Sequence, residues 1–254
     1  MALSEDPGGF FPQKQWAHIC SSMEPGRPLA VVDGHGGGRR WIRQKELRAS
    51  ILASARQLVE GKGYDKVALR ELAFRSDVTA PTIYSLVGRR REVLRSAILE
   101  LSLSKITLAS ELGCTRAKTP ILAWVDIQWS VTALYPCYSR QVVRAMAQPG
   151  NDDLYEALHK ATQAAFLRWL LPIADGGSLR IPVSLPSVAE QLWCLVIAAT
   201  QRWGNGQADL TEYRRDLMSG VGLMMLGLVD KAEARTIERW LGDNLTVDPR
   251  SLTR

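Results

Sequence analysis

The chain has 254 residues, of which 46% are hydrophobic and 23% charged, and its net charge is +6. The length and the hydrophobic content allow a small and a larger domain with apolar cores. No apolar run reaches the roughly 18 residues that indicate a membrane span, and the N-terminus lacks a basic region followed by an apolar core, so we expect neither a membrane segment nor a signal peptide. The four cysteines are far apart and form no CxxC pair, which argues against a metal site or a disulfide framework and favours a reducing, cytoplasmic setting.

Residues 1–41 are predicted to form a separate, flexible N-terminal extension. Glycine and proline recur there in PGG, EPGRP and DGHGGGRRW, which works against regular structure. Two interpretations stay open for the arginines at its end, Arg39, Arg40 and Arg43. They form either a solvated linker, which we favour, or an arm that lies along a minor groove of DNA.

A helix is predicted from about Ile42 to Glu60. Apolar residues recur there at helical spacing, and Gly61 and Gly63 follow the pattern as a stop signal. We expect this helix to brace the two short helices that come next.

Two short helical patterns joined by a tight turn occupy the stretch GYDKVALRELAFRSDVTAPTIYSLV. Asp77 interrupts the pattern with a residue that tolerates positive φ, Thr79 is a good N-cap, and Pro81 falls in the first turn of the second helix. Ile83 and Val87 are expected to face inward. This layout predicts a helix-turn-helix unit that reads DNA.

The open side of the second short helix is predicted to enter a major groove with small and hydroxyl-bearing residues, namely Thr79, Ala80, Thr82, Tyr84 and Ser85. The helix that follows the two short ones begins with Arg89, Arg90 and Arg91, where phosphates would meet both side chains and helix N–H groups.

The stretch VTAPTIYSLVGRRREVL, with GYDKVALRELA and RASILASARQLVEGKG before it, resembles the Tet-repressor (TetR) family of bacterial regulators over roughly 50 residues. The resemblance implies that Pro81, Thr82 and Tyr84 contact DNA, that Arg70 reaches the groove, and that Arg90 stands where the family has a phosphate-binding lysine. Many members have glycine where Asp77 stands.

The excess of positive over negative charge is confined to the same segment. Residues 39–95 carry 14 Lys and Arg against 6 Asp and Glu, a net +8, whereas residues 96–254 are neutral with 16 of each kind. A solvated basic face is the ordinary explanation of a charge run, but it does not predict this confinement. The pattern favours binding to a phosphate backbone.

After Arg91 the pattern is almost wholly helical. A long connecting helix is expected to end at Gly113, a helix opened by Thr119 and Pro120 to end near Pro136, and a short helix to reach about Gln148. The next helix is predicted to end before Pro172, and ADGGSLRIPVSLP to be a loop.

Two further helices are predicted over residues 187–203 and 209–228, with capping boxes at Ser187 and Glu190 and at Asp209 and Glu212. Gly220, Gly222 and Gly227 inside the second are unfavourable by roughly 1 kcal/mol each, and close approach of another helix would compensate. The resemblance implies that the two helices pair with their copies in a homodimer, although an intramolecular core explains the same apolar faces.

The larger domain concentrates aromatic residues, and the resemblance implies a pocket there for a small-molecule inducer. Our candidates for its lining are Trp124, Gln128, Trp129, Tyr135, Arg168 and Trp193. For any one of these aromatic residues, ordinary core packing is the explanation that we favour. His159 has no partner identifiable from the sequence.

The sequence therefore predicts an all-α protein with a flexible extension (1–41), a three-helix DNA-binding domain (42–95), a larger helical ligand-binding and dimerisation domain (96–245) and a C-terminal tail (246–254). We expect a homodimeric transcriptional repressor that binds a palindromic double-stranded operator and is released by an unknown small molecule. The alternatives are an all-α binding protein or enzyme with an incidental helix-turn-helix, and a DNA-binding protein that responds to no ligand. No HExxH, GxSxG or phosphate loop supports an enzyme, and no cofactor is expected.

Overall fold

A computed structural model describes residues 39–115 and 119–245, with the side chains of residues 39, 40, 114 and 115 left out. These residues are helical apart from short connections and one isolated bridge between Leu179 and Val229, which confirms the expected all-α class. They divide into two compact units. Unit 1 holds residues 39–104 and 134–154, and unit 2 holds residues 105–133 and 155–245.

Unit 1 is built on helix α2 (Arg39–Lys62), and an Nη of Arg56 on α2 donates to the Ala97 carbonyl on α5 (Arg90–Thr115). A 3₁₀ turn, η1 (Tyr64–Lys66), leads to the short helices α3 (Leu69–Arg75) and α4 (Ala80–Leu86), and α7 (Pro136–Ala147) packs on α2. Fully buried aliphatic side chains from α2, α3 and α4 form the core of the helix-turn-helix, namely Ile51, Leu52, Leu72 and Ile83. The predicted bracing role of the first helix therefore has a structural basis.

Helix α2 begins earlier than predicted. It starts at Arg39 rather than Ile42, so residues 39–41 belong to a helix and the expected linker is wrong at this end; residues 1–38 lie outside the described part. Arg43 is exposed, as are Trp41 and Ile42, and the Lys45 ammonium lies 3.6 Å from the centre of the Trp41 ring. From residue 39 onward the helix propensity of the residues themselves favours a helix, although the sequence just before them is rich in glycine.

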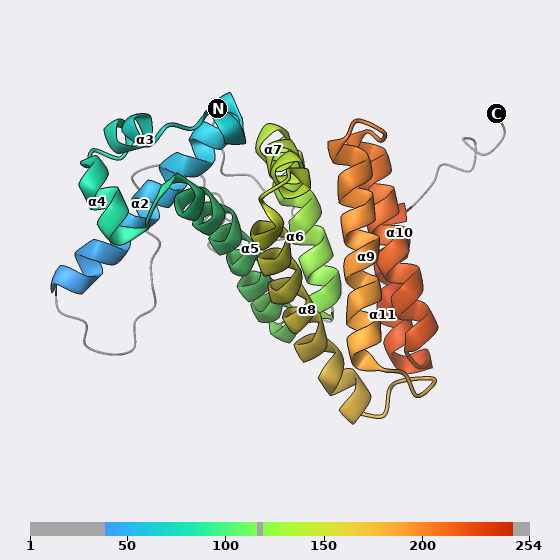
Figure 1. The fold of residues 1–254 in the computed structure, drawn as a ribbon. Helices are drawn as coiled ribbons and strands as arrows, with labels where there is room; N and C mark the ends of the chain where they lie inside the picture. The colour runs from blue at the N-terminus through green and yellow to red at the C-terminus, as the bar shows by residue number, and fades with distance from the viewer. Residues whose placement is uncertain (1–38, 116–118, 246–254) are drawn as a thin grey trace. The chain divides into compact units, whose positions relative to one another are not determined.

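Unit 2 contains the second part of α5 and most of α6 (Pro120–Leu134) and of α8 (Asp152–Asp175). It also contains α9 (Leu185–Gly204), α10 (Leu210–Leu228) and α11 (Lys231–Leu245). Helix α10 contacts both α9 and α11, and the three lie side by side in Figure 1. None of the described helices is long and apolar enough to cross a membrane.

Pro172 lies inside α8, so the prediction that this helix ends before Pro172 is wrong. Proline removes one helical hydrogen bond but does not prevent the helix from continuing where packing favours it. Leu170 is buried just before it, and the Gly176 N–H donates to the Pro172 carbonyl at 3.0 Å just after. The expected loop is correspondingly shorter, between α8 and α9.

The capping box predicted at Ser187 is also wrong, because α9 starts three residues earlier. Ser184 is the N-cap and Pro186 occupies the first turn, a position that favours proline. Glu190 is left free for other contacts. The capping box at Asp209 and Glu212 is confirmed, with the Glu212 N–H donating to Asp209 at 2.8 Å and the Asp209 N–H donating to Glu212 at 3.0 Å.

Helix α11 was not predicted as a separate element, and it explains one of the three glycines in α10. A Cβ on Gly222 would lie 2.4 Å from a Leu241 methyl group and 3.1 Å from the Trp240 ring, so the close helix approach expected there is that of α11. Gly220 faces Leu195 at ordinary distance, and Gly227 has open space around it. Cys137 and Cys194 are free and exposed.

Candidate functional site

The turn between α3 and α4 is closed by backbone hydrogen bonds. The Val78 N–H donates to the Ala73 carbonyl at 3.0 Å and the Asp77 N–H to that of Phe74 at 3.3 Å. Asp77 has φ 51°, the only positive value for a non-glycine residue in the described chain. This confirms that Asp77 takes the left-handed position for which glycine is the cheapest choice.

Helix α4 begins as predicted. Thr79 is its N-cap, and its hydroxyl accepts from the Thr82 N–H at 3.4 Å and lies 2.9 Å from the Thr82 hydroxyl. Pro81 occupies the first turn. The helix ends at Leu86, and the N–H groups of both Val87 and Gly88 donate to the Ile83 carbonyl.

Among the residues of α4, only Ile83 is buried. Tyr84 is 53% exposed, Pro81 and Ser85 are also exposed, and Ala80 and Thr82 are half-buried. Arg70, on α3, is exposed as well. Val87, expected to face inward, is only half-buried because it follows the last turn of the helix. The structure thus leaves the open side of α4 to solvent, with its hydroxyl groups available for hydrogen bonds.

The three arginines at the start of α5 have three different environments, beginning with Arg89. Its side chain is exposed, and its backbone N–H donates to the Glu92 carboxylate. Gly88, just before it, has φ 124°, and a Cβ there would collide with Glu92. One helix N–H that was expected to meet phosphate is therefore occupied by Glu92.

Arg90 is a clamp within unit 1. Its Nε donates to the Val67 carbonyl at 2.7 Å and an Nη to the Tyr64 carbonyl at 2.5 Å, and the guanidinium carbon lies 5.8 Å from the Tyr64 ring centre. A guanidinium can serve two carbonyls at once because its donors form a rigid fork. Arg90 therefore fixes η1 to α5, and only its remaining N–H groups could meet a phosphate.

Arg91 pairs with Asp153 on α8 at 2.5 Å, and Arg95 lies 3.7 Å from the same carboxylate. The hydrogen bond and the attraction to Arg91 hold the pKa of Asp153 below its ordinary value, and the same pair raises the pKa of Arg91. Arg91 is thus engaged in an ion pair within unit 1.

The residues predicted to line a ligand pocket are not all brought together. Tyr135 belongs to unit 1, and Arg168 is exposed on α8. In unit 2, Trp124 packs edge-on against Phe166 at 5.2 Å, and Arg214 lies over the Trp129 ring at 4.8 Å. Trp193 packs against His159 at 5.3 Å and its indole donates to Tyr155. Gln128 accepts a hydrogen bond from the Lys105 ammonium at 2.5 Å.

Two polar features escaped the sequence reasoning. His159 does have a partner, because its Nε2 lies 2.7 Å from Glu190, which also accepts from Gln163 at 2.8 Å. Lys105 and Gln128 lie 23 residues apart on different helices. No local spacing signals either contact, since each depends on how separate helices pack.

Comparison with protein families matches residues 51–86 to the N-terminal model of bacterial regulatory proteins of the tetR family. A search of curated proteins found no match.

Three solved structures share the fold. Thermus thermophilus FadR, described as a TetR-family transcriptional repressor in complex with lauroyl-CoA, is 18% identical with a TM-score of 0.56 and covers 72% of this chain and 96% of its own. SmeT, the repressor of a Stenotrophomonas maltophilia multidrug efflux pump, is 18% identical with a TM-score of 0.57, covering 73% and 92%. The tetR regulator tylp from Streptomyces fradiae is 18% identical with a TM-score of 0.53, covering 82% and 95%.

Proposed function

We propose that this chain, a member of the TetR family, is a transcriptional repressor that binds a palindromic operator as a homodimer and is released by a small-molecule ligand. Each subunit would insert the exposed side of α4 into a major groove. The domain boundaries 42–95 and 96–245 are part of this proposal, with DNA bound by the first domain and effector and partner subunit by the second.

The observation that carries the proposal is the exposure of α4. A seven-residue helix that buries only Ile83 contributes little to the core, yet it is held by a capped start and a closed turn. Tyr84 and Ser85 on its open side can hydrogen-bond to base edges or phosphates, and the methyl group of Ala80 suits the thymine methyl. The confinement of the net +8 to residues 39–95 supports the same partner.

Arg89 is the best candidate for a phosphate contact among the three arginines. Its side chain is exposed, whereas Arg90 holds two carbonyls and Arg91 an ion pair. If it contacts one phosphate, Arg89→Gln lowers the slope of log affinity against log salt by about 1. An unchanged slope would remove Arg89 from the interface.

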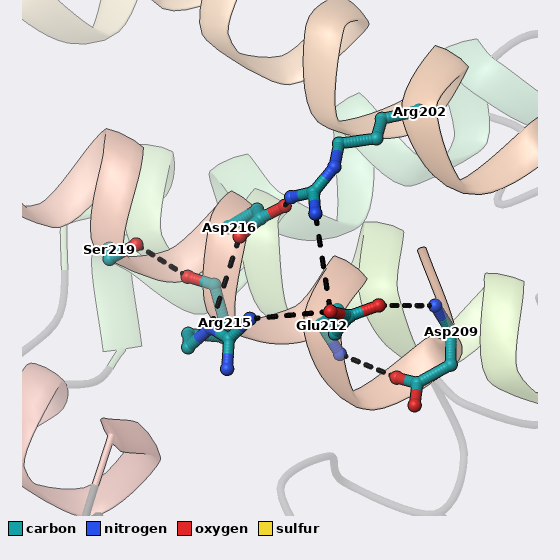
Figure 2. Close-up of polar contacts among 6 residues, drawn as sticks. All are labelled: Arg202, Asp209, Glu212, Arg215, Asp216 and Ser219. Atoms are coloured by element: carbon teal, nitrogen blue, oxygen red, sulfur yellow. Dashed lines mark hydrogen bonds and ion pairs between the residues drawn. The ribbon is translucent and has the colours of Figure 1, made fainter. Parts of the chain in front are cut away.

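Helices α9 and α10 are proposed as the dimer interface. Leu195 and Leu223 are large exposed hydrophobic residues on these helices, 37% and 62% exposed, and Gly227 leaves open space for another helix. An ion-pair network joins the same two helices: Arg202 reaches from α9 to Asp216 and Glu212 on α10, and Arg215 contacts the same two carboxylates (Figure 2). An apolar patch with a polar rim is typical of protein interfaces.

The test is selection of duplexes from a random library by the purified full chain at near-physiological salt. Wild type and the control Leu171→Ala, which changes an exposed residue of α8, should enrich a palindrome, and Tyr84→Ala should not. Arg90 is unsuitable for this test because its loss would also release η1. No enrichment by wild type would reject the proposal, and metabolite turnover without DNA affinity would favour an enzyme.

A further inference from the structure

The ammonium of Lys105 on α5 has a neutral partner and no counter-charge. Its Nζ donates to the Gln128 Oε1 at 2.5 Å. Among the residues that the structure describes, no carboxylate forms an ion pair with it. Burial lowers the pKa of Lys105 to about 8, with no attraction from an acidic group to oppose the change. Lys105 is half-buried, and withdrawing a cation from water is costly unless it is paired.

Gln128 is held in place from its other side. The hydroxyl of Tyr213 on α10 shares hydrogen bonds with the side chains of Gln128 and Thr132 on α6, and it lies 3.4 Å from the Thr200 hydroxyl on α9. Tyr213 is fully buried, and burial raises its pKa. The network joins three helices and fixes the amide of Gln128, so the Lys105 ammonium is directed by a preorganised partner.

Trp124 supplies a second donor on the same face of α6. It precedes Gln128 by four residues, or one helical turn, which places the Cβ atoms of the two residues roughly 6 Å apart. Its indole Nε1 is buried and has no hydrogen-bond partner in the described chain, which is uncommon for a buried N–H. By contrast, the Trp169 Nε1 donates to the Ser110 hydroxyl at 3.0 Å.

The surroundings of Trp124 are apolar. The Phe166 ring meets it edge-on at 5.2 Å and lies 6.0 Å from Trp169 on the same helix, α8. A ligand that reaches the two donors therefore carries an apolar body as well as an acceptor. Such a mixture of apolar walls and few polar groups is typical of small-molecule sites.

We propose that Lys105, Gln128 and Trp124 form the polar end of a site in unit 2 for an organic carboxylate with an apolar body. The ammonium donates to one carboxylate oxygen and the Trp124 N–H to the other, while Gln128 holds the ammonium. One negative charge balances the one positive charge of the half-buried Lys105, which favours a carboxylate over a phosphate dianion. This inference rests on the proposed function, because it names the class of effector.

The test compares acids with alcohols of matched shape by titration calorimetry on the full-length protein. Octanoate and benzoate are the acids, and octan-1-ol and benzyl alcohol are the uncharged partners. Wild type should bind at least one acid at least tenfold more tightly than its alcohol. Lys105→Met should abolish that difference, and the control Lys160→Met, which removes an exposed lysine of α8 paired with Glu156, should keep it.

A second measurement does not depend on a variant. With the lysines carbon-13 dimethylated, the Lys105 methyl resonance titrates with pH, and a bound carboxylate should raise its midpoint by at least one pH unit. Equal binding of acid and alcohol, an unaffected Lys105→Met, an unmoved midpoint, or no binding of any of the four probes would overturn the proposal.

The outcomes separate this site from DNA binding. If Lys105→Met loses octanoate but still enriches the palindrome, the regulator stands and the site is supported. If octanoate binds and no duplex is enriched, the site stands and the proposed regulator falls.

Discussion

A buried arginine in unit 1 and a half-buried lysine in unit 2 have different partners. Arg56 in unit 1 is 3% exposed, and its guanidinium donates to the Ala97 carbonyl on α5 at 2.8 Å. Burial lowers the pKa of Arg56, but attraction to Tyr138 and Glu100 opposes that change. Lys105 in unit 2 has only the neutral amide of Gln128.

The difference separates a cation that supports a fold from one that is poised for a ligand. Arg56 ties α2 to α5 in the frame that supports α3 and α4, and its surroundings supply acceptors from within the chain. Lys105 has one neutral acceptor, Gln128, and no counter-charge in the described chain, and the indole of Trp124, one turn before Gln128 on α6, is unpaired. A perturbed titratable group of this kind is a candidate for function.

The largest effect is expected when the supported cation is removed. Arg56→Gln should lower the free energy of unfolding by about 3 kcal/mol, because the Ala97 carbonyl loses its donor and the long side chain leaves unfilled space. Urea unfolding monitored by circular dichroism gives the value. The matched control Arg43→Gln, on the exposed start of the same helix, should change it by less than about 0.5 kcal/mol. Equal effects of the two substitutions would contradict the structural role assigned to Arg56.

The opposite sign is expected for the unsupported cation. Lys105→Met should raise the free energy of unfolding by about 2 kcal/mol at pH 7, since the lowered pKa represents about 3 kcal/mol and the lost bond to Gln128 removes about 1 kcal/mol. In wild type the unfolded chain binds more protons than the folded chain between pH 8 and about 10.5, so stability rises with pH in that window. The advantage of the variant should therefore shrink from pH 8 upward. If Lys105→Met lowers the free energy of unfolding at pH 7, then Lys105 supports the fold, as Arg56 does.

The two indoles sharpen the comparison within unit 2. Trp169→Phe removes a donor from Ser110, whereas Trp124→Phe removes one that has no acceptor. Thermal or urea unfolding should show a loss about 1 kcal/mol greater for Trp169→Phe. A larger loss for Trp124→Phe would mean that its indole is already satisfied.

The smallest effect concerns an exposed cation, Arg91, where solvent screens the charge. Arg91→Gln should raise the pKa of Asp153 toward its ordinary value, as read from carboxyl chemical shifts. In wild type the contribution of Asp153 to stability is present above its unfolded pKa near 4 and is lost as the pH falls through the lower folded pKa. Asp153→Asn should accordingly match wild type in stability at the acidic end of that range. Replacement of Arg89, which has an exposed side chain, is the control and should leave the Asp153 titration unchanged.

What the sequence predicted well depends on short-range signals. Asp77, Thr79 and Pro81 specify the turn and the start of α4 through their own backbone preferences, and Asp209 specifies the start of α10 in the same way. The family match over residues 51–86 covers the same helix-turn-helix.

What the sequence did not predict depends on packing. The continuation of α8 through Pro172 and the start of α9 at Leu185 were decided by neighbouring helices rather than by the local breaker or cap. The contacts of Arg90 and Lys105 join segments 23 or more residues apart, and no periodicity encodes them. The ligand-pocket residues were chosen by type, and their environments diverged for that reason.

The Arg90 clamp makes residues 64–90 a closed loop of chain, fastened at its base by two carbonyls of the η1 region. Because α4 lies inside this loop and buries only Ile83, its outward residues can be exchanged while the fastening stays intact. Under the proposed function, the exposed Tyr84 and Ser85 can change base preference with little cost in folding, whereas Thr82 contacts the Thr79 cap. Under the proposed function, a change of operator sequence is therefore separated, in physical terms, from a change in the scaffold.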